Sequence, residues 1–344
     1  MRSPAREPVN IAVVVVTYNS GATLARCVDA LTKQTLKPAR ILIIDNASPN
    51  GFPSDRIAGR ADIELVRNPF NVGFAAANNQ ALAMLEKDPH IEWVATVNPD
   101  AFPEPEWLAE MAAAANRYPD CDAFASRLMV DATDNVIDGL GDEYHISGLA
   151  WRSRHGRPLQ PTDLLGREVF AVCAGAALYR LCALEQLGGF DIDLFCYMED
   201  VDLSFRMQRR GMRCRYVPSA VAWHVGGEST RDNPEFRLYY GHRNMILVYL
   251  TNMPPALLLL TLPVHIVVNL IGVVRSLLRG EILVVLRAKW HALKLFGRVR
   301  AKRRRLERAA TVGSWQLWSQ LSKSLRRDLS SSPIVPVEQH RAMG

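Results

Sequence analysis

The sequence lacks the cysteine patterns of zinc-binding and disulfide-rich domains. Its 344 residues contain six scattered cysteines, with no CxxC pair and no histidines at zinc-ligand spacing. We therefore expect reduced and mostly buried thiols without a chemical role.

A glycine-rich phosphate-binding fingerprint is also missing. The first strand-like run, residues 11–16, is followed by TYNSG (17–21) and not by G-x-G-x-x-G or a Walker motif. This argues against a dinucleotide redox cofactor. A nucleotide can still bind if Asp45 accepts a hydrogen bond from the base or ribose while a metal ion neutralises the diphosphate.

The N-terminal sequence lacks the pattern of a secretory signal. Residues 1–10 are polar and contain two prolines, and the apolar run at 11–16 is too short for the core of a signal peptide. We therefore expect synthesis in the cytosol.

Positive charge is unevenly distributed. The net charge is +6, but residues 275–308 contain twelve Lys and Arg against Glu281 and Glu307, a local charge of +10 that leaves −4 for the rest. A basic segment of this kind predicts a polyanionic partner. Because it directly follows an apolar block, we expect an anionic membrane surface and not nucleic acid.

The first hundred residues alternate strand and helix patterns. Apolar runs at 11–16, 40–44, 63–67 and 91–97 predict strands, and the patterns at 24–31 and 73–85 predict helices. This order predicts an α/β fold with an open, doubly wound, mostly parallel sheet that carries helices on both faces. In such folds a ligand binds at the carboxyl ends of the strands.

Polar residues follow each of the four predicted strands. They are Thr17, Tyr18 and Asn19, then Asp45 and Asn46, then Asn68 and Asn71, and finally Asp100. Any one of them could be an ordinary turn residue. Four strands that all end in this way indicate a binding site at that edge of the sheet.

Three carboxylates stand close together where an irregular segment changes to a helical pattern. Glu199, Asp200 and Asp202 favour a helix start, where acidic side chains interact with free N–H groups and the helix dipole. The motifs Asn98-Pro99-Asp100 and Trp223-His224 suggest that they also have a chemical role.

These motifs resemble those of the inverting glycosyltransferases of family 2, which have the GT-A fold, and most closely those of the bacterial rhamnosyltransferases. The matching segments are VVTYN (15–19), IDNAS (44–48), NVGFAAAN (71–78), NPD (98–100) and EDVDLSFR (199–206). The resemblance spans roughly residues 11–250.

The resemblance implies two catalytic roles. Asp200 would be the general base that takes a proton from the acceptor hydroxyl, with Glu199 beside it. Asp100 would hold a divalent metal, Mg²⁺ or Mn²⁺, under the donor diphosphate, in a D-x-D-like element whose first position is Asn98. His224 lies 24 positions after Asp200 and is either a second metal ligand, as in relatives, or a structural histidine.

The resemblance also suggests binding residues. We expect contacts to the nucleotide sugar from Thr17, Tyr18, Asn19, Asp45, Asn71, Gly73, Asn98 and Asp100, and contacts to the acceptor from Gly175, Asp202, Trp223 and Arg243. Residues 123–170 predict hairpins and a mobile loop. For the segment 151–157 a solvated hairpin is favoured over contact with the acceptor.

The expected organisation has three parts. Residues 1–250 form the glycosyltransferase domain, with a nucleotide-binding half at about 10–120 and an acceptor half at about 121–250. Residues 251–325 form an apolar and basic helical region that associates with membranes, and residues 326–344 a disordered tail. The apolar stretch 256–274 is long enough to span a bilayer, but its Pro, His and Asn favour helices in the interface plane.

The expected activity is metal-dependent transfer of L-rhamnose from dTDP-L-rhamnose onto a lipid-linked or growing cell-envelope glycan. It would take place at the cytoplasmic face of the membrane, by peripheral or interfacial association. The alternatives are a transferase that uses UDP-sugars, a non-catalytic nucleotide-sugar-binding relative, and a basic protein that binds membranes or nucleic acid.

Overall fold

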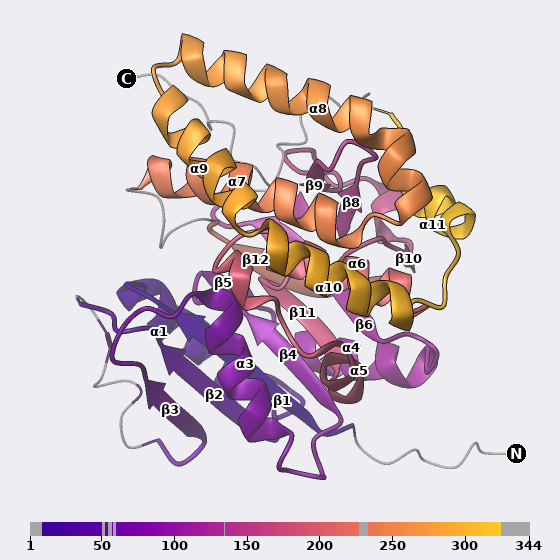
Figure 1. Ribbon diagram of the computed structural model, residues 1–344. Helices are drawn as coiled ribbons and strands as arrows, with labels where there is room; N and C mark the ends of the chain where they lie inside the picture. The colour runs from indigo at the N-terminus through magenta and orange to yellow at the C-terminus, as the bar shows by residue number, and fades with distance from the viewer. Residues whose placement is uncertain are drawn as a thin grey trace, which may run out of the picture.

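The computed structural model describes residues 9–49, 52–53, 57, 60–133, 135–226 and 233–324 (Figure 1). The tail predicted at 326–344 lies outside the described residues. The order of the elements within the described ranges is that of an α/β domain followed by a series of helices.

One large mixed sheet forms the centre of the domain, with the strand order β10-β12-β6-β11-β4-β1-β2-β3. Its parallel half consists of β1 (Ile11–Thr17), β2 (Arg40–Asp45), β3 (Ile63–Arg67) and β4 (Trp93–Val97). The other half contains β6 (Ala123–Val130), β11 (Ala176–Arg180), β12 (Cys214–His224) and β10 (Arg167–Glu168). Two short strands, β5 (Ala101–Pro103) and β7 (Ile137–Gly139), pair with β12 and β6.

Helices cover both faces of the sheet, as the sequence predicts. Alternate residues of β1 enter different cores: Val13 and Val15 pack in the cluster with α1 (Gly21–Thr32) and α4 (Trp107–Arg117). Ala12 and Val14 pack in the cluster with α3 (Phe74–Leu85), α5 (Leu181–Leu187) and α6 (Glu199–Arg209). This double burial explains why the strand is a continuous apolar run.

The antiparallel pairing of β4 with β11 joins the two halves of the sheet. Val97, the last residue of β4, stands opposite Ala176, the first residue of β11. The backbone N–H of Asn98 continues this pairing by donating to the carbonyl of Gly175 at 2.8 Å. The end of the parallel half therefore lies directly beside the segment that precedes β11.

The C-terminal helices pack onto the domain instead of standing apart from it. They are α7 (Pro234–Asn252), α8 (Pro255–Leu278), α9 (Ile282–Lys294), α10 (Phe296–Ala309) and α11 (Ser314–Gln320). Their core residues share one cluster with Phe205 of α6 and with the ribbon of β8 (Asp142–Tyr144) and β9 (Ala150–Arg152). Figure 1 shows α8 along one side of the molecule, with α9 and α7 beside it.

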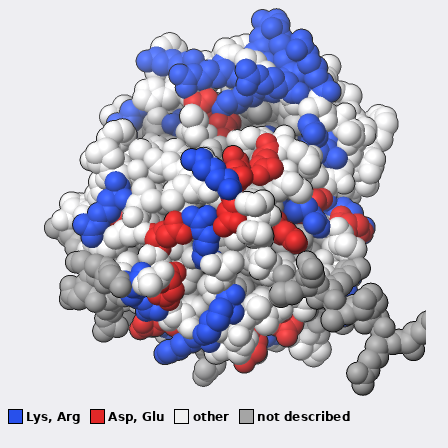
Figure 2. All heavy atoms as spheres, turned by 90° about the horizontal axis from the view of Figure 1, so that it is seen from below, with Lys and Arg blue, Asp and Glu red and all other residues white. Residues whose placement is uncertain are grey.

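Two properties of this region matter for function. By length and composition α8 could cross a membrane, and it is the one helix among the described residues that meets this test. Figure 2, which views the molecule from below Figure 1, shows Lys and Arg gathered along one edge of the face, while acidic and basic side chains mix over the rest.

Candidate active site

A pocket of about 370 Å³ opens at the carboxyl ends of β1 and β4. Asp100 and Asp200, which are a hundred positions apart in the chain, both line it. Of the other predicted residues it is lined by Thr17, Tyr18, Asn71, Gly73, Asn98, Gly175, Glu199 and His224. The fold thus brings the two carboxylate motifs to one cavity.

Asp100 and His224 lie side by side at one end of a series of polar contacts. Asp100 Oδ1 is 3.3 Å from His224 Nε2, and His224 Nδ1 is 2.8 Å from Asp138 Oδ2. Asp138 also accepts from Arg152, and Nδ1 of His155 lies 3.2 Å from its Oδ1. Burial alone would lower the pKa of His224, but the two neighbouring carboxylates outweigh it and raise the pKa to about 9.

The same arrangement suits a divalent cation. The carboxylate of Asp138 contacts Nδ1 of His224. This contact fixes the imidazole ring and leaves Nε2 facing Asp100. Nε2 is buried and has no hydrogen-bond partner other than the Asp100 carboxylate among the described residues. Metal-binding histidines have this kind of outer partner, and an imidazole beside a carboxylate accepts Mn²⁺ or Mg²⁺. The residues present therefore fit a metal.

Asp200 stands in the first turn of α6. Its Oδ2 accepts from the N–H of Ala174 at 3.1 Å and its Oδ1 from the N–H of Val201 at 2.8 Å. Burial raises the pKa of Asp200, and these hydrogen bonds counteract only part of the effect. Burial, and next the charge of Asp200, raise the pKa of Glu199 well above its usual range.

A second group of possible ligands adjoins Asp200. One ligand atom each from Asp142, Cys173 and Asp200 lies within 4.8 Å of the others. Burial raises the pKa of the Cys173 thiol, and burial together with the charge of Asp200 raises the pKa of Asp142 well above its usual range. Metals bind the thiolate and the ionised carboxylate. His224 must also lose its proton to bind a metal, but Asp100 and His224 both line the pocket, whereas Asp142 does not, so Asp100 and His224 are the better pair of ligands.

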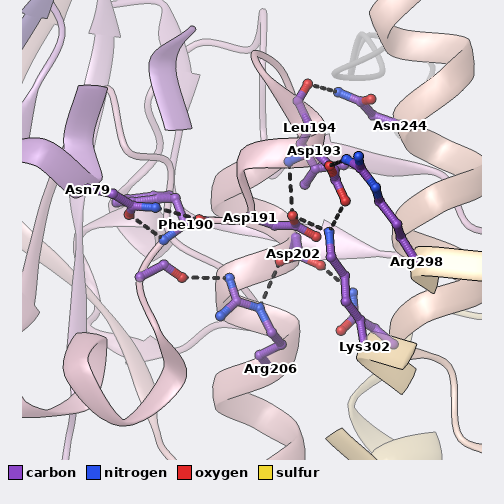
Figure 3. A network of polar contacts seen from close by, with 12 residues as sticks. Asn79, Phe190, Asp191, Asp193, Leu194, Asp202, Arg206, Asn244, Arg298 and Lys302 are labelled. Atoms are coloured by element: carbon purple, nitrogen blue, oxygen red, sulfur yellow. Dashed lines mark hydrogen bonds and ion pairs between the residues drawn. The ribbon is translucent and has the colours of Figure 1, made fainter. Parts of the chain in front are cut away.

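Residues 195–198 form one wall of the pocket. They end the segment 188–198, here called the wall segment, which leads into α6 and includes the 3₁₀ turn η2 (Ile192–Leu194). Phe195, Tyr197 and Met198 adopt left-handed backbone conformations, with φ of 64°, 71° and 64°. Such residues persist only where their surroundings hold them. Figure 3 shows part of the polar network around the residues that precede them, from Phe190 to Leu194.

Five predicted site residues do not line the pocket. Asp45 accepts from the hydroxyl and N–H of Ser48, whose hydroxyl in turn accepts from the N–H of Asn19. Asp202 is buried against Arg206 Nε at 2.8 Å and Asn252 Nδ2 at 2.6 Å.

The other two point elsewhere because of their positions on β12 and α7. Trp223 precedes His224 on β12, faces the other side, and donates from Nε1 to Glu104 at 3.0 Å. Arg243 of α7 donates to the carbonyls of Asp193 and Leu194 at 2.7 and 2.9 Å, so that it holds the wall segment from behind.

The structure adds residues that sequence reasoning did not select. Arg152 of β9 lines the pocket, and Trp151 beside it is buried, so the hairpin predicted to be solvated is part of the site. Asp138 supports His224 although it reads as a turn residue in Asp138-Gly139. Asn46, Cys173, Phe195, Cys196, Tyr197, Asn233 and Phe236 complete much of the lining.

Comparisons with known proteins identify the family of the chain. The model of the family "Glycosyl transferase family 2" matches residues 12–188. The N-acetylglucosaminyl-diphospho-decaprenol L-rhamnosyltransferase of Mycobacterium tuberculosis is 30% identical over 253 residues, which cover 67% of this chain and 81% of that protein. A pre-mycofactocin glycosyltransferase of the same species is 28% identical, over 67% of this chain and 46% of its own length.

Two solved structures share the fold. The mannosyltransferase PcManGT of Pyrobaculum calidifontis, in complex with GDP-Man and Mn²⁺, has a TM-score of 0.51 and 18% identity, and the match covers 90% of this chain and 88% of that one. GalNAc-T7 with UDP, GalNAc and Mn²⁺ has a TM-score of 0.52 and 18% identity, over 64% and 44% of the two chains.

The chain belongs to glycosyl transferase family 2 and is a glycosyltransferase with a GT-A-like fold. This confirms the family and the fold class predicted from the motifs.

Gly73 should tolerate no side chain. Its φ of 88° and ψ of 165° lie in a region essentially restricted to glycine, and an added Cβ would come within 2.7 Å of the carbonyl oxygen of Phe195. We expect Gly73→Ala to lower the free energy of unfolding by at least about 3 kcal/mol in urea denaturation.

Gly188→Ala is the matched control, because its φ is also positive, at 72°, with no atom within 4 Å of the added Cβ. It should cost only about 1 kcal/mol. Equal losses for both variants would show that Phe195 does not press against Gly73.

Proposed function

We propose that the protein is a metal-dependent inverting transferase. It moves L-rhamnose from dTDP-L-rhamnose onto a hydroxyl of a lipid-linked or growing cell-envelope glycan. The observation that carries the proposal is the shared pocket of Asp100 and Asp200. The rhamnosyltransferase relative, whose name specifies a diphospho-decaprenol acceptor, supports both the sugar and the lipid-linked acceptor.

Asp200 acts as the general base in this proposal. Two backbone N–H groups fix its carboxylate, and a carboxylate retains further lone pairs for a hydroxyl. As the acceptor oxygen bonds to the anomeric carbon and the bond to the diphosphate breaks, Asp200 takes the hydroxyl proton. Its raised pKa makes it a stronger base than an exposed aspartate. Glu199 begins the same helix and lines the same pocket, and we propose that it assists.

Asp100 and His224 would hold the cation. When bound, it would neutralise negative charge on the departing nucleoside diphosphate. Asp138 keeps His224 oriented, and Arg152, which contacts Asp138, adds a positive charge to the pocket lining.

The nucleotide would lie against the ends of β1 and β4. Thr17, Tyr18, Asn71 and Asn98 line this part of the pocket. The hydroxyl of Thr17 is buried and makes no hydrogen bond within the described part of the chain. A buried hydroxyl without a partner is costly, so a ligand that bonds to it gains affinity. Asn19, Asp45 and Gly73 are proposed to shape the loops of this half.

The acceptor would enter on the side of Gly175. Gly175 stands next to Asn98, and a Cβ there would approach the Asn98 side chain to 3.3 Å. We propose that three predicted acceptor residues support the pocket without lining it. Asp202 acts through its contact within α6, Trp223 through the sheet, and Arg243 through the wall segment.

We further propose that α8 and α9 dock the enzyme on an anionic membrane surface at the cytoplasmic face. The outer side of α8 exposes a continuous apolar face, for which Leu259, Val267, Leu270, Val274 and Leu278 are between 53% and 81% exposed. Exposed leucines, Trp290 and Phe296 extend it along α9 to the start of α10. A patch of this kind on a protein surface marks an interaction site.

The inner side of α8 explains why the helix lies flat in this proposal. Thr261 bonds with the hydroxyl of Tyr249 at 2.8 Å, and His265 stacks on the Tyr249 ring and contacts the carbonyl of Ser147 at 2.7 Å. Asn269 accepts from Lys289 at 2.5 Å. Thr261, His265 and Asn269, whose polar groups would be costly inside a bilayer, therefore face the protein body, as in a helix that lies in the interface plane.

A donor screen tests the transferase proposal. We expect transfer and slow donor hydrolysis with dTDP-L-rhamnose in Mg²⁺ or Mn²⁺, and neither in EDTA. Asp200→Asn should lower transfer about a hundredfold or more and leave donor binding by calorimetry unchanged. Asp62→Asn, at an exposed position outside the pocket, is the control. Preference for a UDP-sugar would refute the donor assignment, and normal turnover by Asp200→Asn would refute the base.

Vesicle flotation tests the membrane proposal. The protein should float with anionic vesicles, be released by alkaline carbonate, and lose binding at least about tenfold in the double variant Leu270→Asp/Val274→Asp. Leu165→Asp, which alters an exposed leucine elsewhere, should bind normally. Retention in the membrane after carbonate extraction would argue for a spanning α8, and normal binding by the double variant would exclude this face.

A further inference from the structure

The C-terminal helix α10 contacts the wall segment a few residues before the part that lines the pocket. Asp191 and Asp193 belong to the segment 188–198, and in Figure 3 their carboxylates meet Lys302 and Arg298 of α10. Lys302 Nζ bridges both acids, with Asp193 Oδ2 at 2.6 Å, and Arg298 Nη1 is 2.6 Å from Asp193 Oδ1. A helix more than a hundred positions away in the chain is thus joined to the segment that continues into the pocket wall.

The wall segment has little regular structure of its own and is held at several points. Asn79 of α3 exchanges two hydrogen bonds with Phe190, and Asn244 of α7 donates to the carbonyls of Leu194, Cys196 and Tyr197. These contacts fix carbonyls and the two ends of the segment. Within the described residues, the side chains of Asp191 and Asp193 have their ion pairs only with α10.

Lys302 is the stronger of the two basic partners. The side chains of Asp191 and Asp193 are only 14% and 13% exposed, and Lys302 is 32% exposed, whereas Arg298 is 68% exposed. Ion pairs gain strength as water is excluded, and exposed pairs contribute little. Burial alone would raise the pKa of Asp193, but Lys302 and Arg298 outweigh it and lower the pKa, so this acid is ionised in the pair.

We propose that Lys302 is a positioning residue for sugar transfer: through Asp191 and Asp193 it fixes the backbone that forms the pocket wall and leads into Glu199 and Asp200. Arg298 adds to the same contact. The inference rests on the proposed role of Asp200, because it concerns the placement of that carboxylate and of the residues around the reacting sugar.

The two faces of α10 give this contact a further consequence. Val299, Lys302 and Leu306 face the body, while Arg300, Arg304, Arg305 and Arg308 are exposed on the other side. The helix α10 forms the end of the basic segment 275–308, which is expected to meet an anionic membrane surface, and in this proposal it also supports the active site. Removing the C-terminal region would impair catalysis even with a soluble acceptor.

Lys302→Met is the test, because it removes the charge and keeps the length of the side chain. We expect kcat with a soluble acceptor analogue to fall about tenfold or more, with a less than twofold change in KM for the donor, because small displacements of reacting groups are costly. Hydrogen exchange of amides 190–198 should accelerate. Lys302→Arg should restore both, and Arg298→Met should have a smaller effect.

Lys37→Met, an exposed lysine outside the pocket, is the matched control and should change neither readout. Faster exchange in Lys302→Met without a fall in kcat would refute the positioning role. Unchanged exchange would refute the contact itself. A loss of kcat that accompanies a general loss of thermal stability, and that Lys302→Arg does not restore, would also contradict it. Because exchange needs no substrate, its outcome does not depend on the assignment of Asp200.

Discussion

The pairing of β4 with β11 is the contact on which the site depends. It places the end of the last parallel strand, with Asn98 and Asp100 behind it, beside Gly175 and the segment that holds Asp200. A doubly wound sheet by itself gathers ligands for a nucleotide at its carboxyl edge. The added mixed half supplies further lining, so that Asp200 and Asp100 line one cavity.

The sequence predicts the parallel half well because each signal there is local. Continuous apolar runs mark strands that are covered on both faces, and the polar residues after them fall at one edge by geometry alone. Asp138 and Arg152 could not be predicted in the same way. Their roles come from contacts with His224, which is 86 and 72 positions away, and no local pattern in their hairpin encodes these contacts.

Other residues that were predicted for the site do not line the pocket, because their side chains point elsewhere. Trp223 and His224 are neighbours on β12, and strand alternation sends only one of them into the pocket. Asp202 shares the acidic motif with Asp200, yet two positions along a helix turn its side chain towards Arg206 and Asn252. Arg243, which was predicted to contact the acceptor, instead donates to the carbonyls of Asp193 and Leu194. Lys302, from the basic segment predicted to meet a membrane surface, forms ion pairs with Asp191 and Asp193. Burial and partner choice, which are properties of the tertiary structure, decide these roles.

The configuration of the transferred sugar is the most direct test of the central claim. If Asp200 takes the acceptor proton in a single displacement, opposite the diphosphate that leaves beside Asp100, the anomeric centre must invert. The measurement is the anomeric configuration of the product by NMR, compared with that of the donor. An inverted anomeric centre is the predicted result, and a retained one would contradict the account.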